Sequence, residues 1–324
     1  LMFMPIAASV ALLLSRGSEQ HNFKRALVLG VAYAASIGGM ATVIGTPPNV
    51  AAVGIAEKQF QENITFFEWM KIGIPFSFLL LLGVFFLLRV IHFKRSEIIE
   101  GAHEELHQMR ADLGNWSKDE KKVLFVFVSA VMAWIFQQPI ASFTGLTEFN
   151  DTFIALSAGL ILFFLPGSKG EDKLLNWSDT KELNWGVLLM FGGGLAISSV
   201  FKEVGLLDRM VVVLSSLSHW SSEAYLILLC GVGLILTALM SNLAMVTIFV
   251  PIVGVLAKQV GADVSSFVIP VTLAASCDFM FPMSTPPNAI AYGTGWVKAR
   301  EMFGIGLLVN ALAFVLLIVL VCIV

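Results

Sequence analysis

The stretch Gly45-Thr46-Pro47-Pro48-Asn49 decides the fold, because its last four residues return 239 positions later in Ser284-Thr285-Pro286-Pro287-Asn288. In both places apolar sequence runs up to the string and resumes after it, to Ile55 and to Trp296. Two consecutive prolines remove two amide donors and clash with the preceding helical turn. Each string therefore predicts a helix that is broken inside an apolar segment.

The sequence upstream of each string also repeats. Phe3-Met4-Pro5-Ile6 is echoed by Phe249-Val250-Pro251-Ile252, so each copy reads as an apolar helix followed by a broken one. Between the copies lies an even number of candidate crossings, which gives the second copy the opposite orientation. Candidate crossings are 26–44, 72–91, 124–143, 149–165, 185–201 and 304–324, and a short amphipathic piece lies at 210–217.

Composition excludes a water-soluble protein. The 324 residues are 57% hydrophobic and 13% charged, whereas soluble domains have about 45–50% apolar and about 25% charged residues. With Arg16–Arg25 on the cytoplasmic side, fifteen Lys and Arg residues fall on that side and five on the other, as the positive-inside rule requires. We therefore expect an all-α, multi-pass membrane protein, and no basic block indicates nucleic acid as a partner.

A further pair of apolar helices is expected at Tyr225–Leu239 and Leu243–Leu256, separated only by Met240-Ser241-Asn242. Two short helices that meet at a polar tip predict a re-entrant hairpin. Its tip would lie at membrane depth, where backbone groups must be covered by protein or water.

The three breaks are candidate ligand sites. Helix N-termini present free amides and a positive dipole end to an anion, and unwound carbonyls and hydroxyls suit Na⁺. We expect Gly45–Pro47, Ser241–Asn242 and Ser284–Pro286 to converge on one site. Asp278 is the only acid inside a strongly apolar crossing, and it could bind a cation, take up a proton or cap a helix.

The stretches 36–49 and 275–288, together with Ser241-Asn242, resemble the divalent anion/sodium symporter family across essentially the whole chain. The resemblance implies a homodimeric elevator-type transporter of the plasma membrane, or of the inner membrane if the source is bacterial. It also implies a sodium-coupled transporter for dicarboxylates or tricarboxylates and, less often, sulfate. The transport domain would take 1–71 and 185–303, and the scaffold would take 72–184, with an interfacial linker at 94–122, and 304–324.

The resemblance also implies roles for single residues. Substrate carboxylates would be held by six residues: Thr46, Pro47, Ser241, Asn242, Thr285 and Pro286. Two sodium sites would use the residues around each break: Gly45 and Asn49 in the first, and Thr237, Met240, Asn242, Ser284 and Asn288 in the second. Sodium is the coupling ion, and no other metal or cofactor is expected.

Two features depart from the family pattern. Leu243 stands where the hairpin tip of the family has a threonine hydroxyl, which affects the expected substrate contact. The matching first tip would fall upstream of Leu1, so we expect the sequence to begin inside a longer protein and the chain alone not to transport. Substrate-driven sodium uptake by residues 1–324 in liposomes would contradict that expectation.

Other functions are open at this point. A sodium-independent anion exchanger of the same fold, or a membrane sensor that has lost transport, would share these patterns. An enzyme is not expected, because the sequence offers no nucleophile–base pair, and His103 and His107 lack a third metal ligand.

Overall fold

The protein is described by a computed structural model that covers residues 21–92, 114–145, 149–168, 173–182, 221–282 and 284–323, with positions 7, 10, 196, 200 and 203–205. Within these residues the regular structure is helical, apart from one isolated bridge between Pro166 and Lys173. The all-α prediction is confirmed. Four predicted segments lie mostly or wholly outside the described residues: 2–14, 94–122, 185–201 and 210–217.

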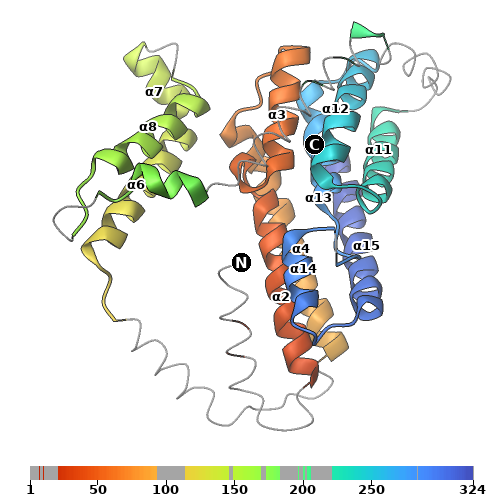
Figure 1. Cartoon of the computed structure of the whole chain (residues 1–324). Helices are drawn as coiled ribbons and strands as arrows, with labels where there is room; N and C mark the ends of the chain where they lie inside the picture. The colour runs from red at the N-terminus through yellow and green to blue at the C-terminus, as the bar shows by residue number, and fades with distance from the viewer. Residues whose placement is uncertain are drawn as a thin grey trace. The chain divides into compact units, whose positions relative to one another are not determined.

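The described helices follow the predicted segments (Figure 1). In chain order they are α2 (His21–Met40), the 3-10 turn η1 (Val43–Gly45), α3 (Pro47–Phe60), α4 (Phe66–His92), α6 (Lys118–Ile135), α7 (Gln137–Thr144), α8 (Asp151–Phe164), the 3-10 turn η2 (Trp177–Glu182), α11 (Ser222–Thr237), α12 (Asn242–Gln259), α13 (Val264–Ser276), α14 (Pro286–Gly293) and α15 (Ala299–Ile323).

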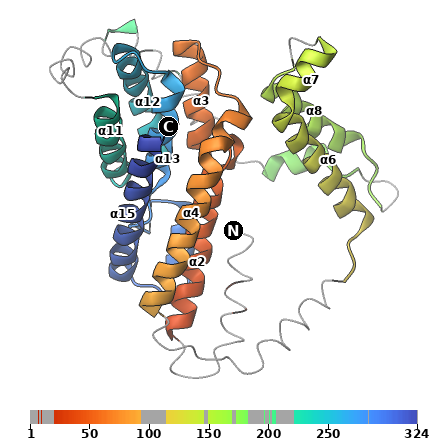
Figure 2. The ribbon, with the colours of Figure 1, turned by 180° about the vertical axis from the view of Figure 1, so that it is seen from behind.

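The chain divides into two compact units. The first contains α2, α3, most of α4 and everything from α11 onward, and the second contains Thr65–Phe67 and α6 to η2. Figure 1 shows α14 beside α2, and both views show α11, α12 and α13 grouped together within the first unit (Figures 1 and 2). All of the described candidate ligand residues lie in this first unit.

Among the described helices, three are long and apolar enough to cross a membrane: α4, α12 and α15, with mean hydropathies of 2.5, 1.6 and 3.0. Their burial differs, since 67% of the apolar window of α12 is buried but only 28% of that of α4. α12 is therefore an interior helix, whereas α4 presents an apolar outer face. Because α12 is longer than the expected Leu243–Leu256, its length does not distinguish a full crossing from a re-entrant helix.

Both Pro-Pro strings start new helices, as predicted. Pro47 opens α3 after the extended residue Thr46, and Pro286 opens α14 after the extended residue Thr285. Proline suits the first helical positions, where its missing N–H is not needed. Apolar sequence runs up to the second string, but the helix does not, because α13 ends at Ser276. Pro282 disfavours helical backbone in the residue before it, and the unwound stretch of the second break is longer than that of the first.

The predicted crossing at 124–143 is also interrupted. α6 ends at Ile135 and α7 begins at Gln137, with Phe136 between them at φ −100° and ψ 20°. Pro139 has no N–H to donate to the carbonyl of Ile135, so a continuous helix would lose a hydrogen bond there. This single missing donor explains the break.

The helices of the first unit pack in crossed pairs. α3 lies against α12 and α13, and α2 lies against α14. Lys258 Nζ, near the end of α12, donates to the carbonyl of Phe60 at the end of α3 over 3.3 Å, so these two helices run in the same direction. Arg25, near the start of α2, pairs with Glu301 at 2.9 Å, beyond the end of α14, so α2 and α14 run in opposite directions.

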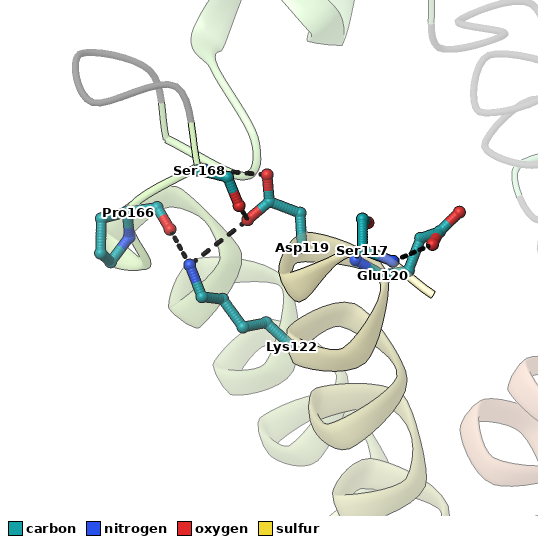
Figure 3. A network of polar contacts seen from close by, with 6 residues as sticks. All are labelled: Ser117, Asp119, Glu120, Lys122, Pro166 and Ser168. Carbon is teal, nitrogen blue, oxygen red and sulfur yellow. Dashed lines mark hydrogen bonds and ion pairs between the residues drawn. The ribbon is translucent and has the colours of Figure 1, made fainter. Parts of the chain in front are cut away.

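The second unit is held by a polar cluster at the start of α6 (Figure 3). The Ser117 hydroxyl caps α6 by accepting from the amide of Glu120 at 3.1 Å. Asp119 accepts from the Ser168 amide at 2.9 Å and from its hydroxyl at 2.7 Å, and these bonds lower the pKa of Asp119 below its ordinary value. The cluster fixes the segment that follows α8 to the start of α6.

Candidate functional site

The first break is held in shape by Asn49, which is fully buried. Its side-chain amide Nδ2 donates to the carbonyl of Gly39 over 3.1 Å and to the carbonyl of Thr42 over 2.9 Å. These carbonyls belong to the last turn of α2 and the loop after it, where intrahelical donors have run out. Asn49 therefore ties the start of α3 back to the end of α2.

Asn288 does the same at the second break. Its Nδ2 donates over 3.2 Å to each of the carbonyls of Asp278 and Phe281, and it lies 3.3 Å from Ser284 Oγ. In both breaks the acceptors are the carbonyls ten and seven residues before the asparagine. The repeat that the sequence shows is thus a repeat of hydrogen bonds as well.

The side-chain oxygens of both asparagines are buried, and neither has a hydrogen-bond partner in the described part of the chain. A buried carbonyl oxygen without a partner loses the hydrogen bonds it would make in water. Such an oxygen is also the type of ligand that a hard cation prefers. One of these oxygens occurs at each break.

Gly45 lies so close to the end of α2 that a side chain would not fit. A Cβ atom at Gly45 would overlap the carbonyl of Gly39. At the matching position of the second break, Ser284 turns its hydroxyl to the Phe281 carbonyl at 2.7 Å. The first break therefore needs glycine for backbone contact, and the second replaces that contact with a hydroxyl.

The turn between α11 and α12 brings further oxygens to the second break. Thr237 Oγ1, which is fully buried, lies 2.9 Å from Asn242 Oδ1 and also contacts the carbonyl of Ala275. A hydroxyl has one proton, so it can serve only one of these two acceptors at a time. Three oxygens with one shared proton suit a cation such as Na⁺.

The helix starts meet at one level. Phe60 contacts Gly254 closely, and Phe60 lies 13 residues after Pro47 while Gly254 lies 12 after Asn242. At 1.5 Å per residue these runs are about 20 Å and about 18 Å. The N-terminal ends of the packed helices α3 and α12 therefore lie at similar distances from this contact. The contact between Thr237 and Ala275 places the C-terminal end of α13 at the same level.

Exposure divides the candidate residues into two layers. Gly45, Pro47, Ser241 and Pro286 are exposed. Behind them, Asn49, Asn288, Thr237 and Thr285 are buried. An anion could therefore reach the helix starts, while the buried layer holds the breaks in position. Leu243, which replaces the family's threonine, is buried in the core and does not belong to the exposed layer.

Residues 2–324 match the model of the family described as sodium:sulfate symporter transmembrane region. The chain belongs to this family. The resemblance to a symporter family is therefore confirmed. Symporters are membrane transporters, so the predictions of an integral membrane protein and of a protein other than an enzyme are confirmed as well.

Two relatives of this chain carry names that state a transport function. It is 35% identical over 304 residues to the sodium-dependent dicarboxylate transporter SdcS of Staphylococcus saprophyticus, covering 93% of this chain and 59% of the relative. It is 34% identical over 305 residues to SdcS of Staphylococcus aureus strain NCTC 8325, covering 93% and 58%. The chain thus spans less than two thirds of the length of these relatives.

Direct contacts in the structure join one part of the predicted ligand set. Thr237 and Asn242 are joined, as are Ser284 and Asn288, and Met240 forms the turn before Asn242. Thr46 and Pro47 belong to the other break, which is related to this cluster by the packing of α3 on α12 and α13. In the described residues no hydrogen bond links Thr46 to Ser241 or Thr285.

Three supporting groups of the symporter fold were not predicted. Tyr33 donates from its hydroxyl to the carbonyl of Phe279 at 3.2 Å, Trp69 donates to the carbonyl of Met40 at 3.0 Å, and Ala275 offers its carbonyl to Thr237. Tyrosine and tryptophan in an apolar segment usually place their polar atom on a buried partner. That tendency could have drawn attention to Tyr33 and Trp69, but a backbone carbonyl leaves no trace in sequence.

An open groove lies on the second unit, lined by residues that include Asp119, Phe127, Ser168 and Lys173. None of the predicted ligand residues lines it. Acidic and basic side chains line this groove, together with residues of the polar cluster of Figure 3. The contacts within that cluster account for the shape of the groove without a ligand. The helix breaks of the first unit remain the candidate site.

Proposed function

We propose that the full-length protein is a secondary active transporter that moves small dicarboxylate-type anions across the plasma membrane, coupled to sodium. The relatives whose names state sodium-dependent dicarboxylate transport support the substrate class and the coupling ion. Tricarboxylates and sulfate are neighbouring candidates, since the family description names sulfate. The anion would be held by Thr46, Pro47, Ser241, Asn242, Thr285 and Pro286.

The observation that carries the proposal is the meeting of helix ends. The N-terminal ends of α3 and α12 would both present a positive dipole end to a carboxylate, and α12, which does not begin with proline, would add the free amides of its first turn. The C-terminal end of α13 lies at the same level and offers carbonyls to a cation. An anion can be bound in this way without a fixed positive charge, which helps it to leave again.

Sodium would bind beside the anion at both breaks. Gly45 and Asn49 would form the first site, and Thr237, Met240, Asn242, Ser284 and Asn288 the second. The unpartnered side-chain oxygens of Asn49 and Asn288 support these assignments. Because sodium would bring positive charge next to the carboxylates, each ligand would strengthen the binding of the other, which is the basis of coupled transport.

The architecture proposed for this function is a pair of inverted halves. The opposite directions of α2 and α14, and the packing of α3 on α13, support that relation. The hairpin α11–α12 would re-enter the membrane, protected by the burial of α12. We assign 1–71 and 185–303 to a moving transport domain and 72–184 and 304–324 to a scaffold that dimerises, as in an elevator mechanism.

Uptake by the full-length protein in proteoliposomes tests the proposal. Radiolabelled succinate should accumulate when an inward sodium gradient is imposed, and replacing sodium with potassium should abolish accumulation. Thr237→Val, which removes a hydroxyl without changing the side-chain shape much, should raise the sodium concentration needed for half-maximal uptake. Thr237→Ser keeps the hydroxyl and should restore it.

The outcomes separate the alternatives. Uptake that does not depend on sodium but requires an anion on the opposite side of the membrane would establish an exchanger. Absence of binding and transport for succinate, citrate and sulfate would establish a sensor or scaffold role. Either result would overturn the proposal.

A further inference from the structure

The two breaks have the same hydrogen bonds but opposite side-chain chemistry at one matched position. Asn49 donates to the carbonyl of Gly39, and Asn288 donates to the carbonyl of Asp278, in each case ten residues earlier. Gly39 and Asp278 therefore occupy equivalent places in the hydrogen-bond pattern, although Gly39 lies in the last turn of α2 and Asp278 lies beyond the end of α13. The first has no side chain, and the second has a carboxylate.

At the first break, the matched position lies close to the predicted sodium ligand Gly45. A Cβ atom at Gly39 would lie 3.1 Å from the carbonyl oxygen of Gly45 and 3.5 Å from Thr46 Cβ. In the second break the residues equivalent to Gly45 and Thr46 are Ser284 and Thr285. The hydroxyl of Ser284 lies 2.7 Å from the main-chain carbonyl of Phe281 and 3.3 Å from that of Asp278.

The carboxyl group of Asp278 is completely buried. Neither of its oxygens has a hydrogen-bond partner, and no ion pair reaches it, within the described residues. Burying a carboxylate without a partner is costly, so proteins pair such groups or use them to bind metal ions. The basic residues that α2 and the segment after α14 contribute, such as Arg25 and Lys298, lie at the far end of this helix pair.

The surroundings of Asp278 supply the rest of a cation site. Its own main-chain carbonyl and that of Phe281 are gathered by Asn288, whose side-chain oxygen is unpartnered. Three residues before Asp278, the Ala275 carbonyl meets Thr237 and, through it, Asn242. Carbonyl and hydroxyl oxygens from two segments are therefore gathered along the backbone on both sides of this buried carboxylate, and hard cations prefer such oxygen ligands.

We propose that the carboxylate of Asp278 is a direct ligand of the sodium ion at the second break, which makes this site charged while the equivalent site at Gly39 is neutral. This inference rests on the proposed function and deepens it. The two sodium sites are then unequal despite their shared backbone. The charged site binds sodium more tightly and fills first, before the anion arrives.

Thermal unfolding of the purified full-length protein in detergent, titrated with NaCl at constant ionic strength and without any carboxylate, tests this inference. The variants are Asp278→Asn, which keeps the shape and removes the charge, and Asp263→Asn, which removes an exposed charge at the start of α13, the helix that precedes Asp278. Choline chloride balances the salt, and potassium chloride serves as the second cation. Equilibrium binding of ²²Na⁺ provides an independent readout.

The inference predicts that Asp278→Asn raises the midpoint of the sodium titration by about tenfold or more, which corresponds to a loss of about 1.4 kcal/mol or more in sodium binding. Without sodium, this variant should melt no lower than the unmodified protein, because it lacks an unpaired buried charge. Asp263→Asn should leave the midpoint unchanged.

Two results would overturn the inference, and they are distinguishable from each other. An unchanged sodium midpoint in Asp278→Asn, or a fall in its melting temperature without sodium while the midpoint holds, would assign the carboxylate to a proton or a structural partner. Failure of sodium to stabilise or bind the unmodified protein would refute the proposed function itself, and the inference with it.

Discussion

At the level of single residues, Asn49 and Asn288 hold the two breaks in shape. Each replaces missing intrahelical donors by a side-chain amide that reaches back to two carbonyls. An asparagine at this place does two things at once, because its amide nitrogen fixes the loop while its oxygen stays available. A loop that is both fixed and rich in oxygen is preorganised for a small cation.

Replacing either asparagine by alanine should therefore loosen its break. Asn49→Ala or Asn288→Ala leaves two buried carbonyls without their donor, at a cost of about 1–3 kcal/mol in unfolding free energy. Sodium-dependent stabilisation should also fall in both variants. Thermal unfolding of the full-length protein with and without sodium measures both effects. The neighbouring exposed residue provides the control: Val50→Ala should change little, and an equal effect there would contradict the role of Asn49.

At the level of elements, the register of α3 on α12 sets where the two helix starts meet. The ring of Phe60 occupies the space that a side chain at Gly254 would need. Lys258 then fixes the end of α3 through the Phe60 carbonyl. The contact lies at the opposite end of both helices from Thr46 and Ser241, so a change here acts on the site only through the register.

Gly254→Ala should press on the Phe60 ring and cost about 1–3 kcal/mol of stability through overpacking. Anion affinity should fall as well, because α3 is displaced from α12. The double variant Gly254→Ala with Phe60→Leu creates room for the added methyl group and should recover most of both losses. If the single variant binds the anion normally, or the double variant loses as much as the sum of its parts, the register is not what aligns the site.

A pH-dependent element links the start of α6 to Ser168. Hydrogen bonds from the Ser168 hydroxyl and amide lower the pKa of Asp119, so the ionised carboxylate stabilises the folded state. This contribution is complete above the pKa of Asp119 in the unfolded chain and is lost as pH falls through its lower folded value. The carboxylate is partly exposed, so the effect is modest.

Comparing the melting temperature of the unmodified protein with that of Asp119→Asn from neutral pH downward measures this contribution. The difference should favour the unmodified protein near neutral pH and vanish in acid. Asp263→Asn, an exposed acid that makes no capping bond, should show no such pH dependence. A difference that persists unchanged in acid would mean that the carboxylate charge is not involved.

Sequence patterns predicted two kinds of element: those marked by the repeated Pro-Pro and hairpin strings, and long apolar helices. Both Pro-Pro starts, the turn at Met240–Ser241 and the long apolar helices α4 and α15 are where we expected them. The end of α13 and the break at Phe136 were missed, because both fall inside apolar sequence. Hydropathy does not change at such a point, so composition alone gives no signal.

The candidate site was predictable in its residue types but not in its connections. The repeated strings identified Asn49, Asn288 and the hairpin turn, and the isolated charge identified Asp278. The carbonyls of Gly39, Thr42, Phe281 and Ala275 could not be assigned, because every residue has a carbonyl and only tertiary packing selects which of them converge.

At the level of the whole molecule, the apolar outer face of α4 indicates a bilayer as solvent. Phe76, Leu80, Val84 and Leu88 form a buried stripe at four-residue spacing. Phe78, Phe85 and Phe86, on the other side of the helix, are each more than half exposed. Exposed aromatic and aliphatic side chains in such number are stable in lipid and not in water.

Nitroxide spin labels distinguish the two faces in the reconstituted full-length protein. A label at Phe85→Cys should collide frequently with oxygen, which partitions into lipid, and rarely with a water-soluble nickel reagent. A label at Val84→Cys, the buried neighbour, should collide rarely with either. Frequent collisions of the Phe85 label with the nickel reagent would place α4 in water and contradict a membrane-spanning helix.

The most direct test of the proposed anion site is a cross-link between the starts of α3 and α12. Packed helices lie about 8–10 Å apart, so cysteines at Thr46→Cys and Ser241→Cys, in the full-length protein with its native cysteines replaced, should be joined rapidly by a short bifunctional thiol reagent. Succinate with sodium should slow the reaction, and succinate with potassium should not. Absence of the cross-link, or a rate that ignores both ligands, would show that these helix ends do not form one anion site.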